Sequence, residues 1–188
     1  MKKILCTLVV TLFVGVSASA QQPTFMKGDN VVGLGIGLVK TYYYGGGWVG
    51  YHGGRTSMPL FFASYERGII NNLFNEKSSL GVSGLFGFSS TKYSDVWKYS
   101  DIVVGARGVL HYALVDKLDT YGGLGFGVSF GSGKYDTGYS EINPKNSYNH
   151  FFPIFSLGAR YYFTDAIAAF AEFGYGYTLI SLGASFKF

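Results

Sequence analysis

Residues 180–188 read ISLGASFKF, and this stretch decides the fold. Every second position is apolar, whereas the positions between them carry Ser, Gly or Lys. Such a period of two is typical of a β-strand with one apolar face. Because that face ends on the aromatic ring of Phe188, we expect the strand to cross a membrane and to finish at the lipid-water boundary.

The same alternation recurs along the chain. It divides the sequence into eight segments, which span residues 30–39, 59–69, 79–91, 101–115, 118–131, 151–163, 167–177 and 178–188. Most of them reach the length of about 9–11 residues that a tilted membrane strand needs. The sequence therefore predicts an all-β fold, an eight-stranded antiparallel up-and-down transmembrane β-barrel.

The predicted links between these strands differ in length. Long links at 40–58, 92–100 and 132–150 alternate with short ones at 116–117 and 164–166. Long loops at one end and short turns at the other are typical of outer-membrane barrels. We expect the long loops to be extracellular and both termini to be periplasmic, because an even number of strands returns the chain to its starting side.

The first residues predict a secretory signal peptide over residues 1–20. Two lysines precede an apolar stretch at 4–16, and Ala-Ser-Ala then supplies a cleavage pattern, which leaves a barrel domain at 21–188. A retained anchor is the alternative, but a membrane helix needs about 20 apolar residues. Cys6 is the only cysteine and lies in the signal, so we expect no disulfide and no thiol chemistry in the mature chain.

The composition excludes several classes of protein. Loss of two lysines with the signal leaves 13 basic and 11 acidic residues, which gives no reason to propose a nucleic-acid partner. The 28 glycines argue against a helical protein, and the 16 tyrosines and 17 phenylalanines argue against disorder.

Two segments carry a resemblance to a known family. LGARYYFTD at 157–165 and AFAEFGY at 169–175 resemble the sixth and seventh strands of small OmpA/OmpX-like eight-stranded outer-membrane β-barrels, within the porin-like outer membrane protein β-barrel domain family. The resemblance covers essentially all of the mature chain. It implies the outer membrane of a Gram-negative bacterium, with outer-membrane lipid and lipopolysaccharide as neighbours. We expect no peptidoglycan-binding domain after residue 188, unlike in the longer two-domain relatives.

The resemblance also implies a role for the last strand. Outer-membrane barrels present a terminal aromatic residue, preceded by alternating apolar residues, to the barrel assembly machinery. In this sequence the matching residues are Ile180, Leu182, Ala184, Phe186 and Phe188.

Charged residues within the strands point to the interior. If the apolar positions face lipid, the opposite positions place Glu66, Arg107, His111, Arg160 and Glu172 in the lumen, where charge is less costly. We expect Arg160 to pair with Glu172 across a short turn. The predicted function of these charges is a structural plug, because an eight-stranded barrel is just wide enough for side chains to fill. The alternative is a gate in a narrow porin-like channel.

Contacts with other molecules are predicted for the first long loop. It carries Tyr42, Tyr43, Tyr44, Trp48 and Tyr51 among glycines, a composition that suits an extracellular glycan, lipopolysaccharide or protein ligand. Strand extension with an aromatic girdle is the alternative.

No convergent catalytic set is visible. The three histidines lie far apart with no metal-ligand spacing, and His52 with Ser57 is the only nearby pair suited to lipid chemistry. We therefore expect no enzyme, no cofactor and no metal. Among the possible functions we rank a structural or surface-interaction role first, a narrow channel second and a lipid-modifying barrel enzyme third. A soluble lipocalin-like barrel would carry its apolar residues inward and leave the inward charges unexplained.

Overall fold

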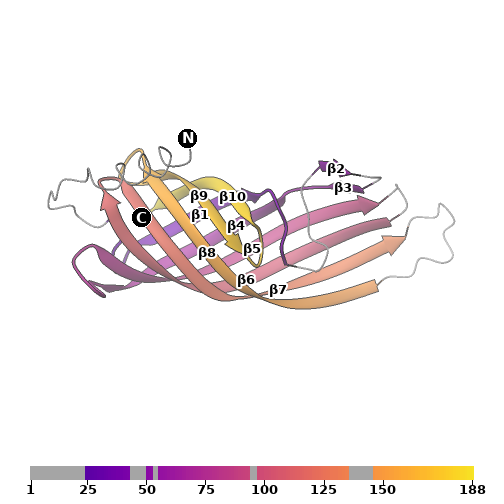
Figure 1. The fold of residues 1–188 in the computed structure, drawn as a ribbon, viewed down its shortest axis with the longest axis horizontal. Coiled ribbons are helices and arrows are strands. Elements are labelled where there is room, and N and C mark those ends of the chain that lie inside the picture. The colour runs from indigo at the N-terminus through magenta and orange to yellow at the C-terminus, as the bar shows by residue number, and fades with distance from the viewer. Residues whose placement is uncertain (1–23, 43–49, 53–54, 94–96, 136–145) are drawn as a thin grey trace, which may run out of the picture.

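The structure is a computed structural model that describes residues 24–42, 50–52, 55–93, 97–135 and 146–188. The predicted signal segment therefore lies outside the described residues. Eight antiparallel strands close into a barrel, which confirms the predicted fold class (Figure 1). No helix in the described ranges is long and apolar enough to cross a membrane.

The order of the strands around the wall follows from their pairing. Starting at one edge of the closure, the wall consists of β5 (Ser78–Tyr93), β4 (Leu60–Asn71), β1 (Asn30–Gly37), β10 (Ile180–Lys187), β9 (Ile167–Tyr175), β8 (Asn146–Tyr162), β7 (Leu118–Tyr135) and β6 (Trp97–Val115). Pairing of β6 with β5 completes the ring. Strands that follow one another along the chain are neighbours in the wall, apart from a small hairpin that the chain forms between β1 and β4.

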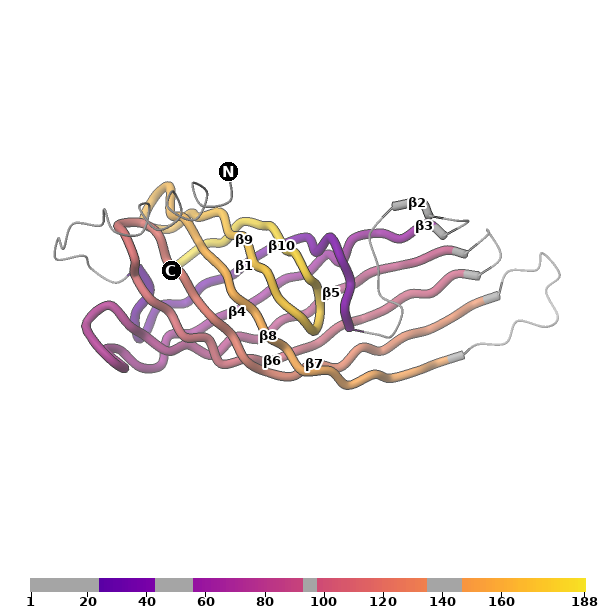
Figure 2. The backbone as a smooth tube through the Cα atoms, in the orientation of Figure 1, coloured from indigo at the N-terminus to yellow at the C-terminus, as the bar shows by residue number. Residues whose placement is uncertain are grey.

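The wall is much taller on one side than on the other. β6 begins at residue 97 rather than 101, β7 ends at 135 rather than 131, and β8 begins at 146 rather than 151, so the expected loops are partly strand. These extensions pair residue by residue, and each carries a tyrosine, an aromatic residue that favours strands. Figure 2 shows β5–β8 continuing well past β1, β9 and β10.

A hairpin lies within the first long loop. β2 (Gly50–His52) pairs with β3 (Arg55–Ser57), and β3 pairs with the end of β5. The hairpin therefore extends the tall side of the wall, which we call the loop end; the opposite end is the short-turn end.

The predicted alternation of side chains is confirmed. Outward residues such as Leu34, Leu124 and Phe173 are exposed by 60% or more, whereas inward Val103 and Ile154 are fully buried. The apolar side chains of the last strand share the outward face, and its end is fixed by backbone hydrogen bonds between Phe188 and Asn30. Recognition of this strand by the assembly machinery stays a prediction.

Inward glycines make room for aromatic rings. A Cβ atom at Gly35 would lie 2.5 Å from the ring of Phe62, and one at Gly127 would lie 2.5 Å from the ring of Phe152. Both distances are shorter than van der Waals contact, so the glycines accommodate large neighbours. Gly176 is needed for a different reason, because its φ of 118° makes the tight link from β9 to β10.

Candidate functional site

The five charged residues predicted to face the interior are all buried, with exposed fractions between 2% and 6%. They come from four strands: Glu66 from β4, Arg107 and His111 from β6, Arg160 from β8 and Glu172 from β9. They do not form one network around a single pair. Instead they divide between two clusters in the short-turn half of the barrel.

The first of these, the Arg107 cluster, is built on a bidentate ion pair. Arg107 Nη2 lies 2.7 Å from Glu172 Oε1, and Nη1 lies 3.0 Å from Oε2. Ser156 accepts a further hydrogen bond from Nη1 at 2.7 Å. The hydroxyls of Tyr121 and Tyr177 both donate to the Glu172 carboxylate. A buried carboxylate with this many donors is held in one orientation.

The second, the His111 cluster, alternates acids and bases. His111 Nε2 lies 2.7 Å from Glu66 Oε1, and Nδ1 lies 3.0 Å from Asp119 Oδ1. Arg160 reaches the same two carboxylates at 3.3 Å each and lies over the ring of Tyr121. His111 Nδ1 hydrogen-bonds to Asp119, and a protonated imidazole at this position would place one positive charge between the two carboxylates. The cluster is then neutral overall.

The predicted pair between Arg160 and Glu172 is wrong. The register of β8 with β9 sets Gly158 opposite Glu172, whereas Arg160 lies opposite Phe170. Arg160 is instead directly across from Asp119 on β7 and donates to it. Sequence reasoning missed Asp119, although it occupies an inward position of the predicted strand at 118–131.

The segment before β1 closes the short-turn end, and sequence reasoning missed this as well. Phe25 is 1% exposed and stacks on the imidazole of His111, with ring centres 4.1 Å apart. Its carbonyl accepts a hydrogen bond from Ser79, and the carbonyl of Thr24 accepts one from Lys187, each at 2.8 Å. No periodic pattern marks this segment, so no signal in the sequence could have identified its role.

An apolar layer separates the short-turn half from the loop half of the interior. The rings of Phe62 and Phe170 have centres 6.2 Å apart, and Phe62 meets Tyr177 edge-on at 5.5 Å. The layer, which we call the aromatic layer, comprises Leu60, Phe62, Leu85, Val103, Phe152, Ile154 and Phe170, and the rings of Tyr42 and Tyr177 pack in the same apolar cluster. Water would have to cross it to pass along the axis.

Polar side chains are buried again in the loop half. Lys40 is 1% exposed, and its ammonium donates to the hydroxyls of Ser89 and Thr91 at 2.8 Å each. Asp101 accepts hydrogen bonds from two tyrosine hydroxyls, at 3.1 Å and 2.8 Å. We call this group the loop-half cluster; its members are Lys40, Tyr42, Ser89, Thr91, Asp101 and Tyr148.

The structure corrects one predicted loop contact. Tyr42 is fully buried, since its hydroxyl bonds to Asp101 and its ring lies 6.1 Å from that of Phe152. Its side chain therefore serves the interior and cannot meet an external ligand. The other predicted contacts, Tyr43, Tyr44 and Trp48 and the side chain of Tyr51, lie outside the described residues.

The described residues bring no catalytic or metal-binding set together. No group of His, Cys, Asp and Glu among them could hold a metal ion. The side chain of His52 lies outside the described ranges, and Ser57 bonds to Thr91. Both nitrogens of His111 already face carboxylates.

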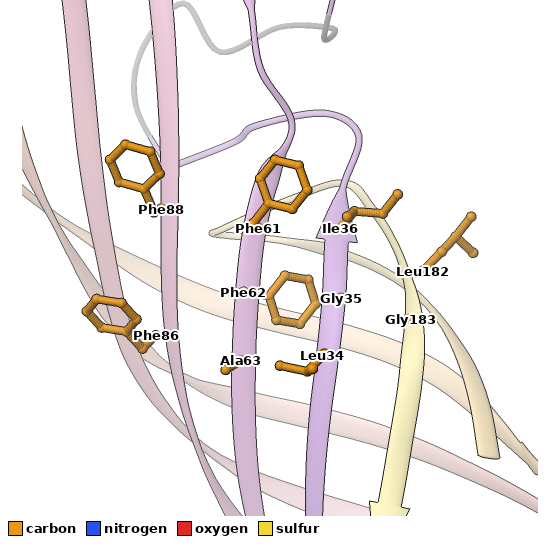
Figure 3. Close-up of a pocket in the computed structure, with 10 residues that line it drawn as sticks. All are labelled: Leu34, Gly35, Ile36, Phe61, Phe62, Ala63, Phe86, Phe88, Leu182 and Gly183. Carbon is orange, nitrogen blue, oxygen red and sulfur yellow. The ribbon is translucent and has the colours of Figure 1, made fainter. Parts of the chain in front are cut away.

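The outer wall carries an apolar hollow of about 620 Å³ over β10, β1, β4 and β5 (Figure 3). It forms because the short side chain of Ala63 lies between Leu34 and Phe86 in one cross-strand row. Its lining offers packing surface for an acyl chain but no polar group that would orient a substrate.

Comparison with known proteins supports the fold alone. No protein-family model matches the chain, and no curated protein matches it. Among solved structures, it is similar to Ail, the attachment invasion locus protein of Yersinia pestis, with 16% identity over 87% of this chain and 100% of that one, and a TM-score of 0.54. Ail in complex with the heparin analogue sucrose octasulfate gives 15% identity, the same coverage and a TM-score of 0.53.

A third similarity is weaker. The N-terminal β-barrel domain of Pseudomonas aeruginosa OprF aligns with 14% identity over 86% of this chain and 98% of that one, with a TM-score of 0.48. The chain therefore has the closed, eight-stranded fold of the small outer-membrane β-barrels.

Proposed function

We propose that the chain is an integral outer-membrane barrel that conducts no ions and acts through the surface at its loop end. The observation that carries this proposal is the filling of the interior. Two neutralised ion-pair clusters, the aromatic layer and the loop-half cluster succeed one another along the axis, and Phe25 closes the short-turn end. A barrel of eight strands has little further space inside.

Membrane placement is supported by the height of the apolar outer face. Along β6 the outward positions are apolar or glycine from Tyr112 to Ile102. Ten residues at about 3.4 Å each, tilted by about 40°, span roughly 26 Å, close to the 25 Å band of membrane barrels. We propose that the loop end is extracellular and that the short-turn end is periplasmic.

The test of the plug is single-channel conductance of the refolded mature chain, residues 21–188, in a planar bilayer. We expect a folded but silent barrel. Discrete openings that change on Glu172→Gln would instead favour the narrow channel, because Glu172 lies at the centre of the Arg107 cluster. Heat-dependent gel mobility serves as the control for folding.

The orientation has its own test on intact cells. Ser147 is exposed at the loop end and Glu76 is exposed in the turn between β4 and β5. We expect a membrane-impermeant thiol reagent to label Ser147→Cys and not Glu76→Cys; the reverse pattern would overturn the orientation.

A surface role needs a ligand, and a sulfated glycan is the first class to test. The support is the fold shared with Ail, which has been crystallised with a heparin analogue. Immobilised heparin should retain the folded barrel at low salt and release it as salt rises. No retention would turn the search to protein ligands.

A further inference from the structure

Three lysines stand side by side on the outer face of the tall wall. In the antiparallel register Lys92 of β5 is directly opposite Lys98 of β6, and Lys98 is directly opposite Lys134 of β7. All three side chains are exposed. Directly opposite residues in a sheet have Cβ atoms only about 5 Å apart, and like charges at that spacing repel one another. We call these residues the lysine row.

Nothing in the described part of the chain neutralises the row. None of the described carboxylates forms an ion pair with any of the three lysines. Asp101, the nearest described acid along β6, is turned inward and is bound by Tyr42 and Tyr148. An anion that bridges neighbouring ammonium groups would relieve this repulsion.

The position of the row suggests which anion this is. Beneath it lies a row of hydroxyls, Ser90, Ser100 and Ser132, and beneath that the apolar row of Phe88, Ile102 and Phe130. Lys98 lies four positions beyond Ile102 along β6, which places the lysines about 10 Å beyond the apolar band at the usual strand rise and tilt. That is the level of lipid headgroups rather than of acyl chains or bulk water.

We propose that the lysine row binds the phosphate groups of a lipid headgroup, with one polyphosphorylated lipid spanning neighbouring lysines. This inference rests on the proposed membrane placement. The acyl chains of the same lipid would pack on the exposed rings of Phe88 and Phe130, which lie below the row on the same face. Hydroxyls of Ser100 and Ser132 can donate to phosphate oxygens from the row between.

The test uses the mature chain in detergent micelles with bisphosphorylated lipid A as ligand, and native mass spectrometry counts the lipid retained. Each lysine near an anionic lipid surface contributes about fivefold to binding, so the triple variant Lys92→Gln, Lys98→Gln and Lys134→Gln should lose on the order of a hundredfold. Lys98→Gln should be the weakest binder among the single variants, because it has a lysine on both sides.

A matched control removes the same charge at the other end of the barrel. Lys27, Lys77 and Lys117 lie at the short-turn end, and their triple change to Gln should alter lipid A retention less than twofold. Dephosphorylated lipid A should bind equally weakly to all variants. Equal retention of lipid A by both triple variants would overturn the proposal.

Other outcomes distinguish lipid binding from the binding of a soluble polyanion and from a wrong membrane placement. Heparin binding that depends on the lysine row, with lipid A binding that does not, would make the row a site for a soluble polyanion and would overturn the lipid assignment. Failure of the wild-type chain to insert into bilayers would refute the membrane placement instead. If the triple variant does not fold, as judged by heat-dependent gel mobility, lipid A retention by the three single variants tests the proposal instead.

Discussion

The two halves of the interior solve the burial of charge in different ways. In the short-turn half, guanidinium groups and an imidazole face carboxylates, as in the bidentate pair of Arg107 with Glu172. In the loop half, the ammonium of Lys40 donates to hydroxyls, and the carboxylate of Asp101 accepts from hydroxyls. All eight strands form the wall in the short-turn half. In the loop half, β5–β8 form most of the wall (Figure 1).

The difference between the two halves shows that the completeness of the barrel wall determines how a buried charge is stabilised. Where strands enclose the axis on every side, opposed charges are held at fixed separations, and removing one leaves its partner buried and uncompensated. Where the wall is partial, short hydroxyl side chains can turn to meet a charge that moves. We therefore expect the short-turn half to contribute the larger and more specific share of stability.

The largest effect should come from breaking the Arg107 cluster. Glu172→Ala removes the carboxylate that Arg107 and two tyrosines all contact, and loss of one partner of a buried ion pair costs about 3–5 kcal/mol. The free energy of unfolding in guanidinium, followed by heat-dependent gel mobility, measures it. A loss below 1 kcal/mol would mean that water already reaches this cluster.

A double variant sharpens this result. Arg107→Met combined with Glu172→Met removes both charges and keeps the volume, so it should be more stable than Glu172→Ala alone. If the double variant is the less stable of the two, the pair itself, rather than the uncompensated charge, carries the stability.

The next effect tests the closure by the segment before β1. Phe25→Ala removes a ring that is 1% exposed and stacks on His111. We expect a loss of about 3 kcal/mol, at the low end for a buried Phe because a chain segment outside the strands can shift. Phe74→Ala is the control: its side chain is 75% exposed, so we expect a change within about 0.5 kcal/mol. Equal losses would show that Phe25 does not close the barrel.

The alternation of apolar and polar residues sufficed to predict the fold and the inward charges, because the side of the wall to which a side chain points depends only on its position in its own strand. Partners were harder to predict, since they depend on the register between strands. On β9, Glu172 lies opposite Gly158, two residues from Arg160, and Arg160 bonds instead to Asp119 on its other neighbouring strand, β7. Lys40 was missed because it follows the last alternating residue and was assigned to a loop, yet its backbone bridges to Thr178 at the barrel mouth.

A smaller effect is expected in the loop half. Lys40→Met keeps the length of the side chain and leaves hydroxyls that can bond elsewhere, so stability should fall by about 1 kcal/mol or less. The same guanidinium titration measures it. A loss as large as that of Glu172→Ala would abolish the contrast between the two halves.

The smallest expected effect is the coupling between the halves. The part of the aromatic layer formed by Leu60, Phe62 and Phe152 lies between the side chains of Lys40 and Glu172. Changes at separated sites without shared partners add within about 0.5 kcal/mol. The variant that combines Lys40→Met with Glu172→Ala should therefore lose the sum of the two single losses. A coupling above 1 kcal/mol would mean that the layer transmits rearrangements along the axis, and a barrel of that kind could open a path through its interior.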